Sequence, residues 1–267
     1  MAWAPVQPKH AIERVRIIIQ MTDMFPDKFL RKLSTDFEDK RMSLGFATKM
    51  LQEGHEVMFD TAGATQTGEK LQLLSWECKR ISAANSIIEL IKVEKNSIIF
   101  ETLEYSSWNN FINRFKEVAL PIIKQVSTFY DIRLMSLEYV DRFIYKGNPL
   151  NAKPDFLNKK IIQQLGEDAK NGKELWHNYR GWFESLEDTK ILINQNIDAH
   201  DLKIGNSDDL TRSIQILTKI QLIYEKSDFN IEKQDIELQK MHIRSKEMVI
   251  SILSEEMSDK IGISIES

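Results

Sequence analysis

The sequence has few residues of the kinds that break or cross-link a chain. Among 267 residues there are 10 glycines, 6 prolines and one cysteine. Because no low-complexity run accompanies them, the chain is expected to be folded throughout, with loose ends only in the first nine and last seven residues. The single Cys78 cannot form an internal disulfide, which predicts a reducing, cytoplasmic location.

Long apolar runs and an excess of basic charge are missing too. No window approaches the apolar length that spans a bilayer, and the opening MAWAPVQPKH lacks the features of a secretion signal, so we expect no membrane contact. The 36 Lys and Arg face 40 Asp and Glu, with residues 1–150 nearly neutral and 151–267 mildly acidic. This balance makes a nucleic-acid partner unexpected.

The residues that are present predict strands and helices in an α+β protein. A β-branched strand is expected at 11–21, and a helix follows Pro26. Three strand-like runs at 70–82, 86–95 and 97–105 have connections short enough for an antiparallel meander.

A second helix is expected after that meander. Apolar residues recur at helical spacing from Trp108 to Val126, with Ser106 or Ser107 as the N-cap and a kink or break near Val118 because Pro121 removes a backbone donor. The run from Ile132 to Tyr145 is predicted to be a long strand.

The second half repeats these ingredients. We expect a helix at 154–165, strands at 176–186, 190–198 and 210–226, and a final helix from Asp235 to near Gly262. The fold predicted is two tandem α+β units, residues 1–150 and 151–267, with largely antiparallel sheets and helices packed on them.

The strand IRLMSLEYVDRFIY carries three charged residues that could belong to a site. Glu138 and Asp141 are three positions apart and point to opposite faces, so they cannot act as one catalytic carboxylate pair. Glu138 and Arg142 share a face. We expect them to form a structural charge network with Glu13 or Arg14 of the first strand.

Other chemical motifs are weaker. The segment Gly63–Lys70 imitates a phosphate loop but leads into a strand, and no G-x-S-x-G elbow is present. Metal ligands could come from Asp198, His200 and Asp201, or from His55 and Glu56, yet without a second ligand cluster both segments are expected to be solvated loops. No cofactor and no metal are predicted, and no catalytic residue can be assigned.

An aromatic group in the second half suggests an interface. In a strand, Trp176 and Trp182 face one way and Tyr179 and Phe183 the other, so both faces need cover, either from the first half or from another chain. His242 lies on the apolar stripe of the last helix, as a core or interface histidine. These five residues are the candidate interface of a homo-oligomer, most simply a symmetric dimer.

Four segments resemble a known family. AIERV (11–15) is similar to an opening P-I-x-E strand, and EYSSWNNF (104–111) to an aromatic helix start. MSLEYVDRF (135–143) resembles a G-L-R-Y-x-N-R strand, with Glu138 and Asp141 in place of Arg and Asn, and LQKMHIRSKEMVISIL (238–253) resembles a C-terminal L-H helix. The family is a sporadically distributed prokaryotic one of unknown function. The resemblance implies an accessory protein of mobile or defence-related loci.

These observations predict a non-enzymatic protein-interaction or sensor module in an accessory bacterial system, which could be an anti-phage defence system. Two alternatives stay open: a small-ligand binder with a cleft between the two halves, and an enzyme whose site is assembled from distant residues.

Overall fold

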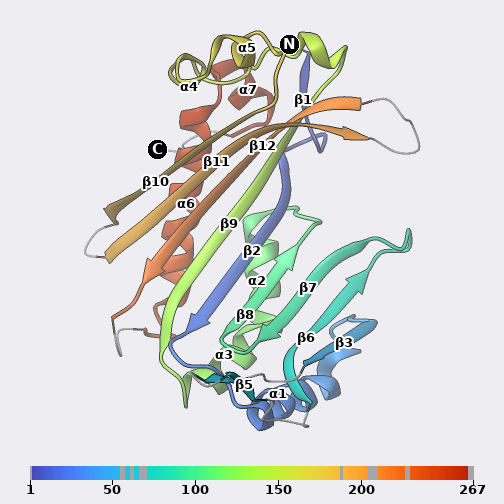
Figure 1. Cartoon of the computed structure of the whole chain (residues 1–267), viewed down its shortest axis with the longest axis vertical. Coiled ribbons are helices and arrows are strands. Elements are labelled where there is room, and N and C mark those ends of the chain that lie inside the picture. The colour runs from blue at the N-terminus through green and yellow to red at the C-terminus, as the bar shows by residue number, and fades with distance from the viewer. Residues whose placement is uncertain are drawn as a thin grey trace. The chain divides into compact units, whose positions relative to one another are not determined.

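The computed structural model describes residues 2–54, 58–60, 63–65, 71–186, 189–203, 210–225 and 229–263, with only the backbone described for 58–60 and 63–65. The chain divides into two compact units (Figure 1). Unit 1 comprises Met1–Val15, Ser136–Ile223 and Asn230–Ser267, and unit 2 comprises Arg16–Met135 and Tyr224–Phe229.

Unit 1 is built on an antiparallel sheet. Its strands are β1 (Trp3–Pro5), the start of β2 (Ile12–Met21), most of β9 (Ile132–Tyr145), β10 (Trp176–Leu186), β11 (Thr189–Lys203) and β12 (Leu210–Ile223). They are ordered β10-β11-β12-β9-β2, with β1 antiparallel to the end of β9. The helices are η1 (Pro149–Asn151), α4 (Lys159–Gln163), α5 (Glu167–Lys170), α6 (Gln234–Ile252) and α7 (Glu255–Lys260).

Helix α6 covers one face of this sheet. Ile197 of β11 and Ile216 of β12 are fully buried in a core cluster with Val249 and Ile252 of α6. Trp3 is also fully buried in that cluster, and its Nε1 donates to the Lys153 carbonyl oxygen at 2.7 Å. The expectation that the first nine residues are loose is therefore wrong, because this one large side chain fixes the N-terminal segment.

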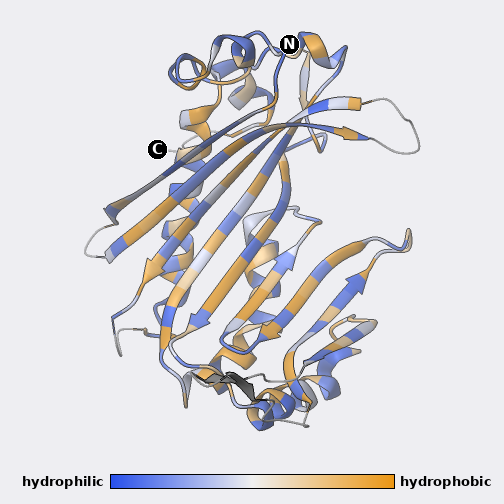
Figure 2. Cartoon of the chain, in the orientation of Figure 1, coloured by the Kyte–Doolittle hydropathy of each residue, from blue (hydrophilic) through white to orange (hydrophobic). Residues whose placement is uncertain are grey.

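The other face of β10, β11 and β12 carries no helix among the described residues of unit 1. Strand alternation places on it the residues of β11 that lie between the buried Ile191, Ile193, Ile197 and Ala199. Figure 2 shows the alternation of polar and apolar residues along β11 and β12. We call this surface the open face; its β10 residues are His177, Tyr179, Gly181, Phe183 and Ser185.

Unit 2 contains a meander and, among its described residues, three helices. Its strands are the rest of β2, then β3 (Thr48–Gly54), β6 (Gln72–Ile81), β7 (Ile87–Glu94) and β8 (Ser97–Thr102), in the order β2-β8-β7-β6-β3. β4 (Met58–Asp60) and β5 (Gly63–Thr65) form a separate pair. The helices are α1 (Asp27–Arg41), α2 (Trp108–Val118) and α3 (Leu120–Ser127).

The predicted meander is confirmed, since β6 pairs antiparallel with β7 and β7 with β8. Helix α2 packs on it, with Phe100 of β8 5.7 Å from the Phe111 ring and 5.9 Å from the Phe115 ring between centroids. The expected break near Val118 is present: α2 ends there, and α3 begins at Leu120 with Pro121 in its first turn.

The α+β class with a large antiparallel sheet is confirmed. The two units, however, do not divide the chain at residue 150, because unit 1 leaves off at Val15, within β2, and resumes at Ser136, within β9. The helix expected at 154–165 is only the short α4. The last helix is shorter than expected, since α6 ends at Ile252 and Ser254 caps α7 through the Met257 amide. In the described part of the chain, no helix has the length and apolar character to cross a membrane.

Candidate functional site

Arg142 is the centre of a highly connected polar group in unit 1. Its Nε and Nη2 atoms donate to the two carboxylate oxygens of Glu13 at 2.7 and 2.8 Å. Nη1 reaches His200 Nε2 at 2.6 Å and Ser213 Oγ at 3.0 Å, and Nη2 also donates to Gln215 Oε1 at 3.0 Å. We call these five residues the Arg142 cluster.

The cluster joins four strands, because β2 supplies Glu13, β9 Arg142, β11 His200 and β12 the other two. Arginine has no acceptor, so the short contact requires His200 Nε2 to accept and His200 to be neutral. Burial, followed by the nearby Arg142 charge, lowers the pKa of His200. All N–H donors of the guanidinium are therefore used within the chain. The cluster connects strands and does not present a free cation to a ligand.

A second ion pair joins the same two strands. Arg14 Nη2 lies 3.3 Å from Glu138 Oε1, and the Glu138 side chain is nearly inaccessible. Thus Glu13 contacts Arg142 and Arg14 contacts Glu138, two pairs rather than one continuous row. Asp141 is adjacent to Arg142 on the other face of β9, the face that carries the buried Phe143, and it is 4% exposed. Burial raises the pKa of Asp141 to about 7.

The segment expected as a solvated loop with Asp198, His200 and Asp201 is instead part of β11, and that expectation is wrong. The three side chains have different partners. Asp198 contacts His177, His200 contacts Arg142, and Asp201 accepts from Arg212 Nε at 2.6 Å. Within the described ranges no three His, Cys, Asp or Glu residues are placed to hold a metal ion. His55, Glu56 and most of the phosphate-loop-like segment lie outside the described residues.

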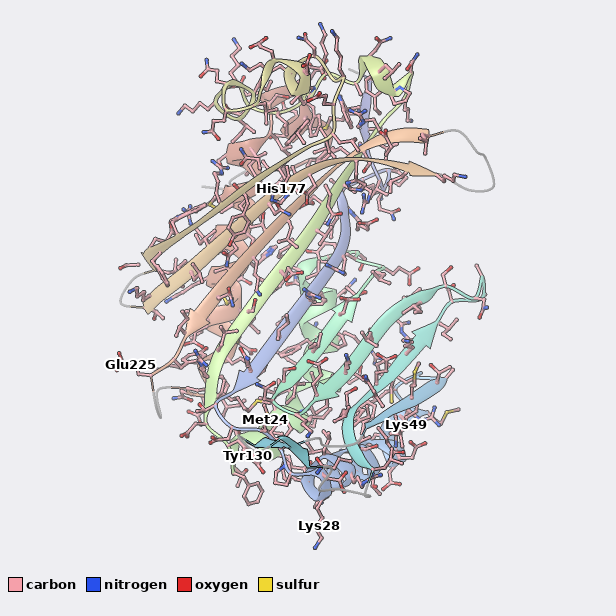
Figure 3. The ribbon with its side chains drawn as sticks, in the orientation of Figure 1. Met24, Lys28, Lys49, Tyr130, His177 and Glu225 are labelled. Carbon is pink, nitrogen blue, oxygen red and sulfur yellow. The ribbon has the colours of Figure 1, made fainter. Side chains whose placement is uncertain are left out.

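The pair of His177 and Asp198 was not anticipated from the sequence. The two residues face each other directly across β10 and β11 on the open face, and His177 Nδ1 hydrogen-bonds to Asp198 Oδ1. His177 is labelled in Figure 3. Asn196 Nδ2 donates to the other carboxylate oxygen at 2.6 Å. A hairpin register counted from Leu186 opposite Thr189 would have found this pair, because 177 and 198 are then directly opposed.

The candidate interface residues separate by face. Tyr179 and Phe183 are 60% and 56% exposed on the open face, while Trp176 packs against the core cluster. Trp182 is half-buried and donates from Nε1 to Glu184 at 3.2 Å. His242 lies on α6, where its Nδ1 is 2.8 Å from the Tyr139 hydroxyl oxygen. Of the five, only Tyr179 and Phe183 offer large apolar surfaces to a partner.

Fold and site together define an α+β protein whose antiparallel sheet is covered by a helix on one face in unit 1 and carries aromatic side chains on the other. No protein-family model matches the chain, and no curated protein matches it. The family resemblance therefore stays a prediction.

Proposed function

We propose that this protein is a non-enzymatic protein-interaction module that binds a second copy of itself through the β10 side of the open face. The observation that carries the proposal is the exposure of Tyr179 and Phe183 on one strand of that face. Neighbours on β11 hold both rings in place: the Tyr179 hydroxyl donates to Asn194 Oδ1 at 2.5 Å, and Lys190 Nζ lies 4.7 Å from the Phe183 ring centroid.

Exposed aromatic side chains in fixed positions favour binding, since little conformational entropy is lost when a partner covers them. Residues 151–267, which the sequence predicts to form an α+β unit, supply β10, β11, β12 and α6 to this surface. A cytoplasmic location rests on the single buried Cys78. Membership of an accessory bacterial system rests on the resemblance alone.

Light scattering coupled to size exclusion tests the proposal. We expect the wild-type chain to elute with twice the monomer mass at micromolar concentrations, and the double variant Tyr179→Ser/Phe183→Ser to elute as a monomer with unchanged circular dichroism. Phe129→Ser is the matched control, because Phe129 is 70% exposed but belongs to unit 2. A wild-type monomer throughout that range would contradict the proposal.

An enzymatic function receives one specific observation, the His177 and Asp198 pair. A carboxylate that orients an imidazole is one part of a general base. Among the described residues, however, no hydroxyl or thiol is recorded as hydrogen-bonded to His177, so the nucleophile of such a site is not identified. Support for an enzymatic function would be a measured activity that His177→Ala abolishes while the variant still self-associates.

A further inference from the structure

Strand β10 is the edge of the sheet in unit 1. Its eleven residues pair with β11 along their whole length, and β10 stands at the end of the strand order. An edge strand presents a row of backbone donors and acceptors that another strand can use. Natural edges are commonly protected by charged side chains, above all lysine, or by proline. The segment WHNYRGWFESL contains no lysine or proline, and of its two charged residues Glu184 is paired with Arg244 of α6.

The side chains of β10 complement themselves about Gly181. If two copies of β10 pair antiparallel with Gly181 opposite Gly181, then Tyr179 stands opposite Phe183 of the other copy, and His177 opposite Ser185, all on the open face. On the other face, Arg180 meets Trp182, Asn178 meets Glu184, and Trp176 meets Leu186. Four of these five are favourable cross-strand pairs: aromatic with aromatic, cation with aromatic ring, amide with carboxylate, and apolar with apolar.

Gly181 itself fits the centre of such a pairing. A Cβ atom there would lie 3.0 Å from Asn194 Oδ1 and 3.2 Å from the Tyr179 hydroxyl, so a side chain would disturb the hydrogen bond that holds the tyrosine. On a twofold axis two glycines face each other and leave space between the two aromatic pairs that flank them. Glycine at this position is thus favoured both by the contacts within the chain and by the paired arrangement.

We propose that two copies of this chain join β10 to β10 antiparallel, with a twofold axis at Gly181, so that the sheet of unit 1 continues from one copy into the other. The inference rests on the proposed function and adds the binding mode and the register. Such a contact is isologous, because both copies use the same residues. It is also closed, because the β10 edge of each copy is then paired.

Cysteine cross-linking tests the register. In the double variant His177→Cys/Ser185→Cys, each new thiol stands opposite a thiol of the other copy. Directly opposed residues in an antiparallel pair have Cα atoms roughly 4.5–5.5 Å apart, within the range for a disulfide. We expect nearly all of this variant to migrate as a covalent dimer after mild oxidation. The wild-type chain is the blank, since Cys78 is fully buried and burial raises its pKa to about 11.

Each single variant is a matched control. Residue 177 of one copy would be eight positions from residue 177 of the other, about 27 Å at the rise of a strand, so His177→Cys alone should give no covalent dimer. The same holds for Ser185→Cys. The pair Asn178→Cys/Leu186→Cys reports an axis shifted by one residue to Trp182, and it should remain monomeric on a denaturing gel.

The outcomes separate the inference from the function it rests on. Cross-linking of the 178/186 pair without the 177/185 pair would overturn the register. A dimer by light scattering in which neither pair cross-links would overturn β10 pairing and leave self-association standing. A wild-type monomer by light scattering would overturn both β10 pairing and self-association. The β10 edge could then bind only a different protein.

Discussion

Two titratable residues in unit 1, the buried Asp141 and the half-buried His242, respond to pH in opposite directions. Burial raises the pKa of Asp141 to about 7 from 3.8, so the folded protein binds a proton there that the unfolded chain releases. Burial, with a smaller effect of the Lys246 charge, lowers the pKa of His242 to about 4 from 6.5, so the unfolded chain binds a proton that the folded protein lacks. Between pH 4 and 6.5 the two effects on stability oppose each other.

Replacing Asp141 removes one of these effects. The protonated Asp141 stabilises the folded state fully below pH 4, and this stabilisation is lost as pH rises toward 7. Asp141→Asn should therefore gain stability relative to wild type by roughly 1.4 kcal/mol per pH unit across that range. Urea unfolding at pH 4.5, 5.5, 6.5 and 7.5 measures the difference. His242→Gln is the control with the opposite sign: its stability relative to wild type should fall as pH rises from 4.5 to 6.5, because wild type gains stability over that range. A pH-independent difference for Asp141→Asn would contradict the burial argument.

Arg142 offers a second prediction at the scale of single residues. Arg142→Met removes five hydrogen bonds and leaves His200, Ser213 and Gln215 without that donor, of which Ser213 is fully buried. We expect a loss of about 2–3 kcal/mol in the free energy of unfolding. Arg133→Met, on the exposed start of the same strand, should change it by less than about 0.5 kcal/mol. Equal effects of the two substitutions on the free energy of urea unfolding would contradict the role of the Arg142 cluster in holding the strands together.

Among the secondary-structure elements, α2 is attached to the meander by a buried charge. Glu89 of β7 is 2% exposed, and Arg114 of α2 donates to it from Nε at 3.0 Å and from Nη2 at 2.8 Å. Arg80 Nη2 is also within 3.5 Å of Glu89. Apolar packing of Phe111 and Phe115 on Phe100 brings the helix to the sheet, and the ion pair sets its position along β7.

Breaking that pair from one side should be worse than removing both charges. Arg114→Met leaves Glu89 buried with a weaker partner and should lower the free energy of unfolding by about 3 kcal/mol, whereas Arg114→Met/Glu89→Leu should recover at least half of it. A double-mutant cycle measured by denaturant unfolding checks this. Additive losses from the two substitutions would show that the side chains act independently.

For the whole molecule, self-association makes stability depend on concentration. A dimer that dissociates on unfolding has a melting temperature that rises with protein concentration, by mass action. We therefore expect the melting temperature of the wild type to rise by a few degrees between 1 and 100 µM, since 1 kcal/mol shifts the melting temperature of a chain of 150–250 residues by roughly 2–4 °C. Tyr179→Ser/Phe183→Ser should melt at one temperature at all concentrations. A concentration-independent wild type would contradict self-association.

Much of the secondary structure was predictable because it depends on local pattern. The strand 176–186 was predicted with the bounds that β10 has, and the break after Val118 followed from Pro121. The Arg142 cluster was only partly predictable: strand parity suggested Glu13 as a partner, but His200, Ser213 and Gln215 come from strands 58 to 73 residues away, and nothing local sets those registers. Likewise β1 went unnoticed, because three residues carry no periodicity.

By itself the amino-acid sequence determined most of the long strands and helices and their faces, since alternation and helical spacing are properties of neighbouring residues. Tertiary structure decided the rest: that residues 136–223 share a unit with residues 1–15, that Asp198 meets His177 and His200 meets Arg142, and that β10 stands at an edge. The physical reason is that strand order and register depend on which apolar faces α6 covers and on hydrogen bonds between distant segments, and the spacing of residues along one strand does not contain that information.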